Sequence, residues 1–224
     1  MINIKEKLIE AEQKALQLFN TIEEKKIIAA GKTEKEINTE IFKLADELYG
    51  IKKYWHKRII RAGANTLKPY DENPPDLMVQ EDDILFIDFG PIFEDYEADF
   101  GRTYVLGNDL QKIKLKNDIE AAWYETKAWF ETQTKLSGAE FYQYAVNIAI
   151  KYGWEFGGEI AGHLIGQFPH EKLEPQNYGL YIHPENHNDI FALDANGNKR
   201  NWILEIHFVN REQEIGGFFE QLLT

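Results

Sequence analysis

Ile84-Leu85-Phe86-Ile87-Asp88 is an apolar run that ends in a carboxylate, and Ala98-Asp99-Phe100-Gly101-Arg102-Thr103 follows shortly after it. The first run predicts a buried strand. The second belongs to a returning strand from Tyr96 to Leu106, with the hairpin turn near Glu94-Asp95. A carboxylate in such a strand needs a cation, a proton or several hydrogen-bond donors beside it. These two segments therefore predict an antiparallel hairpin of a sheet and, at its carboxylates, a candidate functional site.

The register of the hairpin brings its two aspartates together. With a two-residue turn, Asp88 lies opposite Gly101, and Asp99 is two residues from Gly101 on the same face. We therefore expect both carboxylates to point the same way.

A second hairpin, from Trp202 to Leu223, carries another acid pair. If its turn is Glu212-Gln213, Glu205 lies directly across from Glu220, with about 5 Å between the Cβ atoms. Two carboxylates this close on a buried face repel each other unless a cation or a shared proton lies between them.

His163, within Gly162-His163-Leu164-Ile165-Gly166, adds an imidazole, and the chain has no cysteine. Taken singly, each of these residues is more often a turn, cap or core residue, but two same-face acid pairs with a histidine favour metal binding. Four carboxylates and one imidazole suit two divalent ions, which we expect to be manganese, iron, cobalt or zinc. The predicted ligands are Asp88, Asp99, His163, Glu205 and Glu220.

The rest of the sequence predicts an α+β domain whose second half repeats the order of helices and strands of the first half. Apolar spacing predicts helices from Ile4 towards Ile28 and over residues 109–134, and capping boxes at Thr33/Glu36 and Ser137/Glu140 open two more, which end at Gly50 and Gly153. Further strands are expected at residues 58–62, 160–165 and 190–193, and an irregular functional loop at 172–189. We expect a single domain, 1–224, whose halves, about 1–107 and 108–224, share one sheet with helices outside.

Composition excludes several classes of function. The 224 residues carry a formal charge of −13 with dispersed basic residues, which argues against nucleic-acid or anionic-membrane partners. No signal-peptide core or long apolar run is present, so we expect a cytoplasmic protein. Trp123, Tyr124 and Trp129 could form a homodimer interface or belong to the core.

These motifs resemble the pita-bread metallopeptidases, which include methionine aminopeptidase, aminopeptidase P and prolidase, and the resemblance covers most of the chain as their catalytic domain. It implies that Asp88 chelates one metal, that His163 and Glu205 bind the other, and that Asp99 and Glu220 bridge both. It also implies that Glu205 moves a proton during metal-assisted hydrolysis and that His170 hydrogen-bonds the substrate carbonyl or its oxyanion.

The chain departs from the family pattern at several positions. Tyr70 stands where relatives carry a loop histidine and is our candidate substrate contact, while Glu159 replaces a prolidase histidine. His56 could substitute for the loop histidine, but we expect it at the surface beside Trp55. Ile206 follows the first C-terminal glutamate, where relatives often have proline.

We predict an aminopeptidase or dipeptidase acting on small peptides or other amine-bearing molecules. The alternatives are a non-peptide C–N hydrolase with the same metal site, a non-catalytic binding module of the same fold, and a metal-free structural protein.

Overall fold

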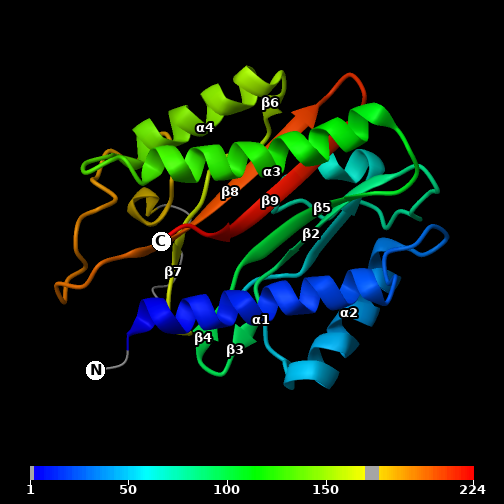
Figure 1. Ribbon diagram of the computed structural model, residues 1–224, viewed down its shortest axis with the longest axis horizontal. Helices are drawn as coiled ribbons and strands as arrows, with labels where there is room; N and C mark the ends of the chain where they lie inside the picture. The colour runs from blue at the N-terminus through cyan, green and yellow to red at the C-terminus, as the bar shows by residue number, and fades with distance from the viewer. Residues whose placement is uncertain (1–2, 170–176) are drawn as a thin grey trace.

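The two predicted hairpins lie next to each other in the middle of one antiparallel sheet (Figure 1). The computed structural model describes residues 3–169 and 177–224. Within these residues the sheet has seven strands in the order β1-β2-β5-β9-β8-β6, with β7 also paired to β8. Their bounds are Ile59–Ala62 (β1), Ile84–Phe89 (β2), Phe100–Val105 (β5), Glu155–Phe156 (β6), Leu164–Ile165 (β7), Asn201–Asn210 (β8) and Ile215–Leu222 (β9). The tip of the first hairpin forms a separate pair, β3 (Ile92–Phe93) with β4 (Tyr96–Glu97).

Four α-helices in the described residues cover the outside of the sheet (Figure 1). Helices α1 (Ile4–Glu24) and α2 (Glu34–Tyr49) accompany the β1–β2–β5 half, and α3 (Leu110–Phe130) and α4 (Gly138–Tyr152) accompany the β8–β9–β6 half. Short 3-10 helices span Gly63–Leu67 (η1) and Tyr178–Leu180 (η2). None of the helices among the described residues has the length and apolar character that a bilayer crossing requires.

Both predicted capping boxes are confirmed. The side chains of Thr33 and Ser137 accept hydrogen bonds from the backbone three residues ahead, and the glutamates there bond back to the cap residues. Gly50 and Gly153 end the two helices in the left-handed conformation. These reciprocal bonds satisfy backbone groups that a helix end leaves unpaired, so the helix boundaries could be predicted from sequence alone.

Strand alternation decides which side chains leave the core. Leu85, Ile87 and Phe89 of β2 are buried in the hydrophobic cluster that includes the apolar faces of α1 and α2. Because successive side chains point to opposite faces, Asp88 points away from these helices. On β8, Leu204, Ile206 and Phe208 belong to the cluster beneath α3 and α4. Glu205 therefore projects from the same side of the sheet as Asp88.

Two strand predictions are wrong in part. Of the predicted strand 160–165, the regular ladder with β8 includes only Leu164–Ile165, although the carbonyl groups of Ala161 and His163 also accept hydrogen bonds from β8. Gly162 interrupts the strand, because its positive φ of 139° carries the backbone close to the Ile203 carbonyl. Residues 190–193 form no strand: residues 190–191 are in a turn, where the Asp189 carboxylate accepts hydrogen bonds from the backbone of Leu136 and Phe191. The short strand β6 was not predicted.

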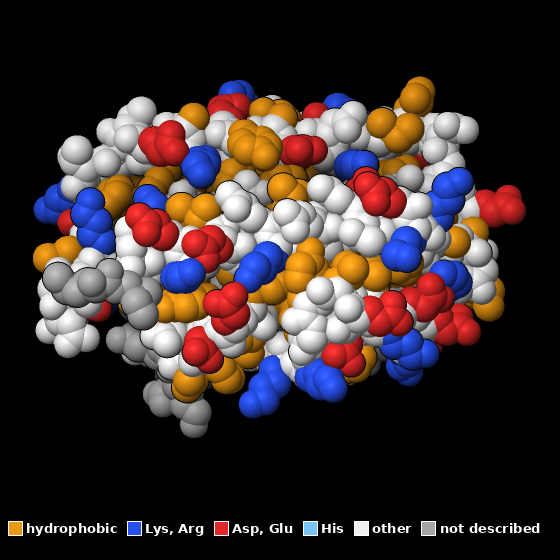
Figure 2. All heavy atoms as spheres, turned by 60° about the horizontal axis from the view of Figure 1, so that its bottom comes forward, with side chains coloured by type: hydrophobic (Ala, Val, Ile, Leu, Met, Phe, Trp, Pro, Cys, Tyr) orange, Lys and Arg blue, Asp and Glu red, His pale blue; other side chains and the backbone are white. Residues whose placement is uncertain are grey.

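The surface mixes charges, and the aromatic residues of α3 divide between core and surface. Figure 2 shows one face on which acidic and basic side chains are interspersed with hydrophobic ones. Trp123 is fully buried against Phe219, and Trp129 stacks on Tyr144 with 3.6 Å between ring centroids. Tyr124 is exposed. Trp123 is thus a core residue.

Candidate metal centre

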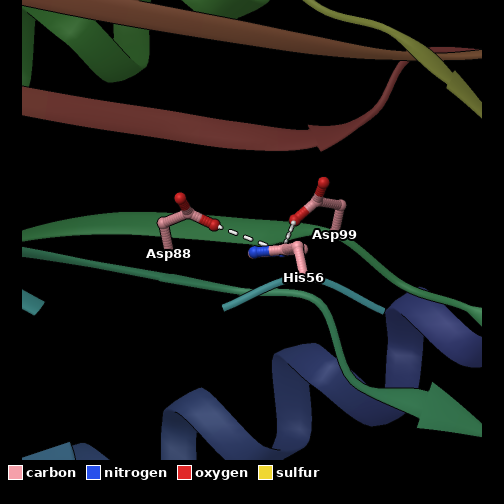
Figure 3. A group of neighbouring side chains, drawn as sticks. All are labelled: His56, Asp88 and Asp99. Carbon is pink, nitrogen blue, oxygen red and sulfur yellow. Dashed lines mark hydrogen bonds and ion pairs between the residues drawn. The ribbon is translucent and has the colours of Figure 1, made fainter. Parts of the chain in front are cut away.

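The first hairpin holds its aspartates as predicted. Asp88 pairs with Gly101 across β2 and β5, and Asp99 directly precedes β5. Both side chains are buried. Their carboxylates point toward the same imidazole, that of His56 (Figure 3).

The second hairpin brings the glutamates together. Glu205 pairs with Glu220, as the register predicted, and their carboxyl groups share a hydrogen bond. Glu220 is buried, and its Oε2 atom has no hydrogen-bond partner in the described part of the chain. Such an oxygen is unfavourable unless a cation or a proton accompanies it.

His163 joins the two hairpins. Its Nε2 atom lies 3.0 Å from Oδ2 of Asp99 and 3.8 Å from Oε1 of Glu220. Its Nδ1 atom lies 2.8 Å from the Leu164 carbonyl oxygen. A carbonyl only accepts hydrogen bonds, so Nδ1 carries a proton and Nε2 faces the carboxylates, which is the usual orientation of a metal-binding histidine.

His56 is a correction to the sequence analysis. Its side chain is 9% exposed, and Nε2 lies 3.0 Å from Oδ1 of Asp99 and 3.6 Å from Oδ1 of Asp88. Trp55 contacts both imidazoles, with ring centroids 4.5 Å from His56 and 5.1 Å from His163. The surface location predicted for His56 is wrong because contacts with the hairpin pull residues 54–56 inward.

Burial and mutual repulsion change the acidity of this cluster. Burial raises the pKa of Asp88 to about 7, and the charges of Asp99 and Glu205 add to the effect. Burial likewise raises the pKa of Glu205 to about 7. For Asp99 burial acts in the same direction, but the charge of His56 and hydrogen bonds from both histidines lower its pKa to about 2. Asp99 is therefore the one firmly ionised carboxylate of the hairpin at neutral pH.

The donor atoms suit divalent cations. Two groups of described residues each bring three potential ligand atoms within 4.8 Å of one another, namely His56, Asp88 and Asp99, and Asp99, His163 and Glu220. Asp99 belongs to both, and Glu205 lies beside the second through Glu220. Carboxylate and imidazole donors without sulfur favour hard or borderline ions. The unpartnered Glu220 oxygen also fits a bound cation.

The cluster opens into a cavity of about 930 Å³. Tyr70 lines it with its ring centroid 6.0 Å from that of His56, and its hydroxyl accepts a hydrogen bond from the Lys57 backbone. Glu159 also lines the cavity and is exposed. The predicted substrate contact Tyr70 thus has access to this space, whereas His170 lies outside the described residues.

Comparisons with known proteins agree with this arrangement. Residues 6–198 match the sequence model of Metallopeptidase family M24. The Xaa-Pro dipeptidase of Pyrococcus horikoshii is 30% identical over 173 residues, which cover 76% of this chain and 46% of that protein. This chain thus spans about half the length of that relative.

Solved structures support the fold. X-Pro aminopeptidase from Thermotoga maritima aligns with a TM-score of 0.75 at 21% identity, over 98% of this chain and 61% of that one. Methionine aminopeptidase from Rickettsia prowazekii aligns with a TM-score of 0.71 at 14% identity, over 99% and 95%. The predicted α+β pita-bread fold is therefore confirmed.

Proposed function

Because the chain belongs to Metallopeptidase family M24, we propose that it is a hydrolase that uses two divalent metal ions to cleave small peptides with a free amine. The observation that carries the proposal is the sharing of Asp99 between two potential ligand groups on one face of the sheet. A shared carboxylate is what a pair of ions about 3.5–4 Å apart needs as a bridge. We assign Asp88, Asp99, His163, Glu205 and Glu220 as ligands.

Divalent ions bound in such a site supply Lewis acidity, which acidifies water and polarises a carbonyl group. Glu205 is our candidate for accepting and returning the proton, because it is a buried carboxyl group directly opposite Glu220 in the candidate metal centre. Tyr70 is our candidate for holding the substrate, since its hydroxyl hydrogen remains available for donation. His170 keeps its predicted role as a hydrogen-bond donor to the substrate carbonyl.

Arg61 supports a substrate with a free carboxylate. It lies on β1, lines the same cavity, and donates through Nη2 to the Glu72 carbonyl oxygen at 2.8 Å. Its Nε atom is buried and lacks a hydrogen-bond partner among the described residues. A guanidinium pairs well with a carboxylate, so we favour dipeptides over longer peptides. Xaa-Pro dipeptides are the first candidates, in line with the Pyrococcus relative.

The proposal is tested with the purified chain, stripped by chelation and reloaded separately with Mn²⁺, Co²⁺ and Zn²⁺. We expect hydrolysis of dipeptides, including Xaa-Pro dipeptides, slower hydrolysis of the same dipeptides with an amidated carboxyl end, and no activity after chelation. Binding of metal without cleavage of any peptide would contradict the peptidase assignment. The replacement of an imidazole by Tyr70 favours one second candidate, hydrolysis of a non-peptide C–N bond, and simple amides with a free amine belong in the same screen.

A further inference from the structure

We infer that His56 is a sixth metal ligand, so that each of the two metal positions has its own imidazole. The inference rests on the proposed function, because it assumes that the chain binds two ions. It goes beyond the five-ligand assignment, in which His163 supplies the one nitrogen donor.

The two histidines meet Asp99 in the same way. Nε2 of His56 lies 3.0 Å from Oδ1 of Asp99, and Nε2 of His163 lies 3.0 Å from Oδ2 of the same carboxylate. In both residues Nδ1 is hydrogen-bonded to the carbonyl oxygen of the next residue, at 2.7 Å for His56 and 2.8 Å for His163. Because a backbone carbonyl fixes the proton on Nδ1, Nε2 is the nitrogen that can exchange its proton for a metal ion.

The second neighbour of each imidazole belongs to a different acid. His56 faces Asp88 at 3.6 Å, whereas His163 faces Glu220 at 3.8 Å. Metal–ligand bonds of about 2.1 Å place neighbouring donor atoms about 3.0 Å apart at right angles and about 3.4 Å apart at tetrahedral angles. The separations around His56 match these values as well as those around His163 do.

His56 is held in place by several contacts with the first hairpin. The Trp55 backbone amide donates to the Gly90 carbonyl oxygen at 3.0 Å, and the Trp55 indole donates to the Ala98 carbonyl oxygen at 3.1 Å. A Cβ atom at Gly90 would lie 2.1 Å from the His56 ring, so glycine is what lets the imidazole approach Asp88. These contacts place the His56 ring beside the carboxylates of Asp88 and Asp99 (Figure 3).

X-ray absorption spectroscopy of the protein loaded with Zn²⁺ alone tests the inference. Imidazole rings give a distinct multiple-scattering signal, and we expect about one imidazole for each bound zinc in the wild type. With enough zinc present to keep both sites filled, His56→Ala should halve that number; it should also weaken one of the two zinc sites by at least about tenfold, measured by competition with a chelator. His183→Ala is the matched control, because His183 lines the same cavity but belongs to neither ligand group; it should change neither quantity.

The wild-type spectrum alone tests whether His56 binds a metal ion, even if a variant folds poorly. Two bound zincs that share one imidazole would overturn the role of His56 and leave the proposed function intact, since His56 would then only hydrogen-bond the aspartates. Failure of the wild type to bind zinc would instead overturn the proposed function itself. Two zincs with two imidazoles, one of which is lost in His56→Ala, support the inference.

Discussion

Replacing Glu205 by glutamine should stabilise the metal-free protein at alkaline pH while it weakens metal binding. Burial raises the pKa of Glu205 from 4.5 to about 7. A carboxyl whose pKa is raised on folding contributes its full stability below pH 4.5 and loses it as the pH rises through 7. At 1.36 kcal/mol for each unit of pKa, this difference amounts to at most about 3 kcal/mol by pH 8.

Glutamine removes that loss because it stays neutral, and its amide can still donate a hydrogen bond to Glu220. Urea unfolding in the presence of a chelator, at pH 4 and pH 8, measures the effect. Metal-free Glu205→Gln should match the wild type at pH 4 and exceed it by up to about 3 kcal/mol at pH 8. Addition of metal should reverse the order, since a ligand stabilises the folded state in proportion to its affinity.

Glu212→Gln is the control for this experiment. Glu212 lies in the exposed turn of the same hairpin, and we expect its replacement to change stability by less than about 0.5 kcal/mol at either pH. If metal-free Glu205→Gln is less stable than the wild type at pH 8, or if the difference between them does not depend on pH, the reasoning from burial is refuted.

Three further outcomes are expected. Asp99→Ala should remove both metals together, because its carboxylate belongs to both ligand groups, and plasma emission spectroscopy that still finds metal would show that the bridge is misassigned. His170→Ala should keep the metals and lower turnover, so a loss of metal there would speak against its role as a substrate contact. Burial lowers the pKa of His207 to about 4, and its Nε2 bonds the Thr66 carbonyl oxygen at 2.8 Å. Between pH 6.5 and pH 4 the unfolded chain therefore takes up a proton that the folded chain excludes. The free energy of unfolding of the wild type should fall by about 3 kcal/mol over this range relative to that of His207→Gln, and urea midpoints that change in parallel for the two proteins would disprove this.

The acid pairs could be predicted from sequence because short antiparallel hairpins fix their own register. The turns at Glu94-Asp95 and within residues 211–214 determine which residues face each other, and the observed pairs Asp88–Gly101 and Glu205–Glu220 follow directly. Only local sequence is needed for this step. The capping boxes could be predicted for the same reason.

His56 could not be placed in this way because its position depends on distant residues. Tyr54, Trp55 and His56 form no periodic pattern, and their contacts are with Gly90, Pro91 and Asp99, more than thirty residues later in the chain. A weak signal was present in Gly90, since a glycine at the end of a buried strand often marks a close approach of another segment. The short strand β6 could not be predicted for a similar reason, because its two residues pair with residues of β8 that lie more than fifty positions later in the chain.

The two kinds of proposed ligand therefore depend on different parts of the fold. Asp88, Glu205 and Glu220 lie on paired strands and Asp99 directly precedes one, and a substitution elsewhere can hardly change the register of these strands. The imidazoles are carried by irregular segments that glycines bring close to the sheet: Gly90 makes room for His56, and Gly162, just before His163, lies where a Cβ atom would be 2.0 Å from the Ile203 carbonyl oxygen. A side chain at either glycine would displace an imidazole without touching an acid. Such a change would leave the carboxylates in place, still repelling one another, with fewer donor atoms to bind the cation that reduces their repulsion. We therefore expect these glycines to matter to metal affinity as much as the histidines do.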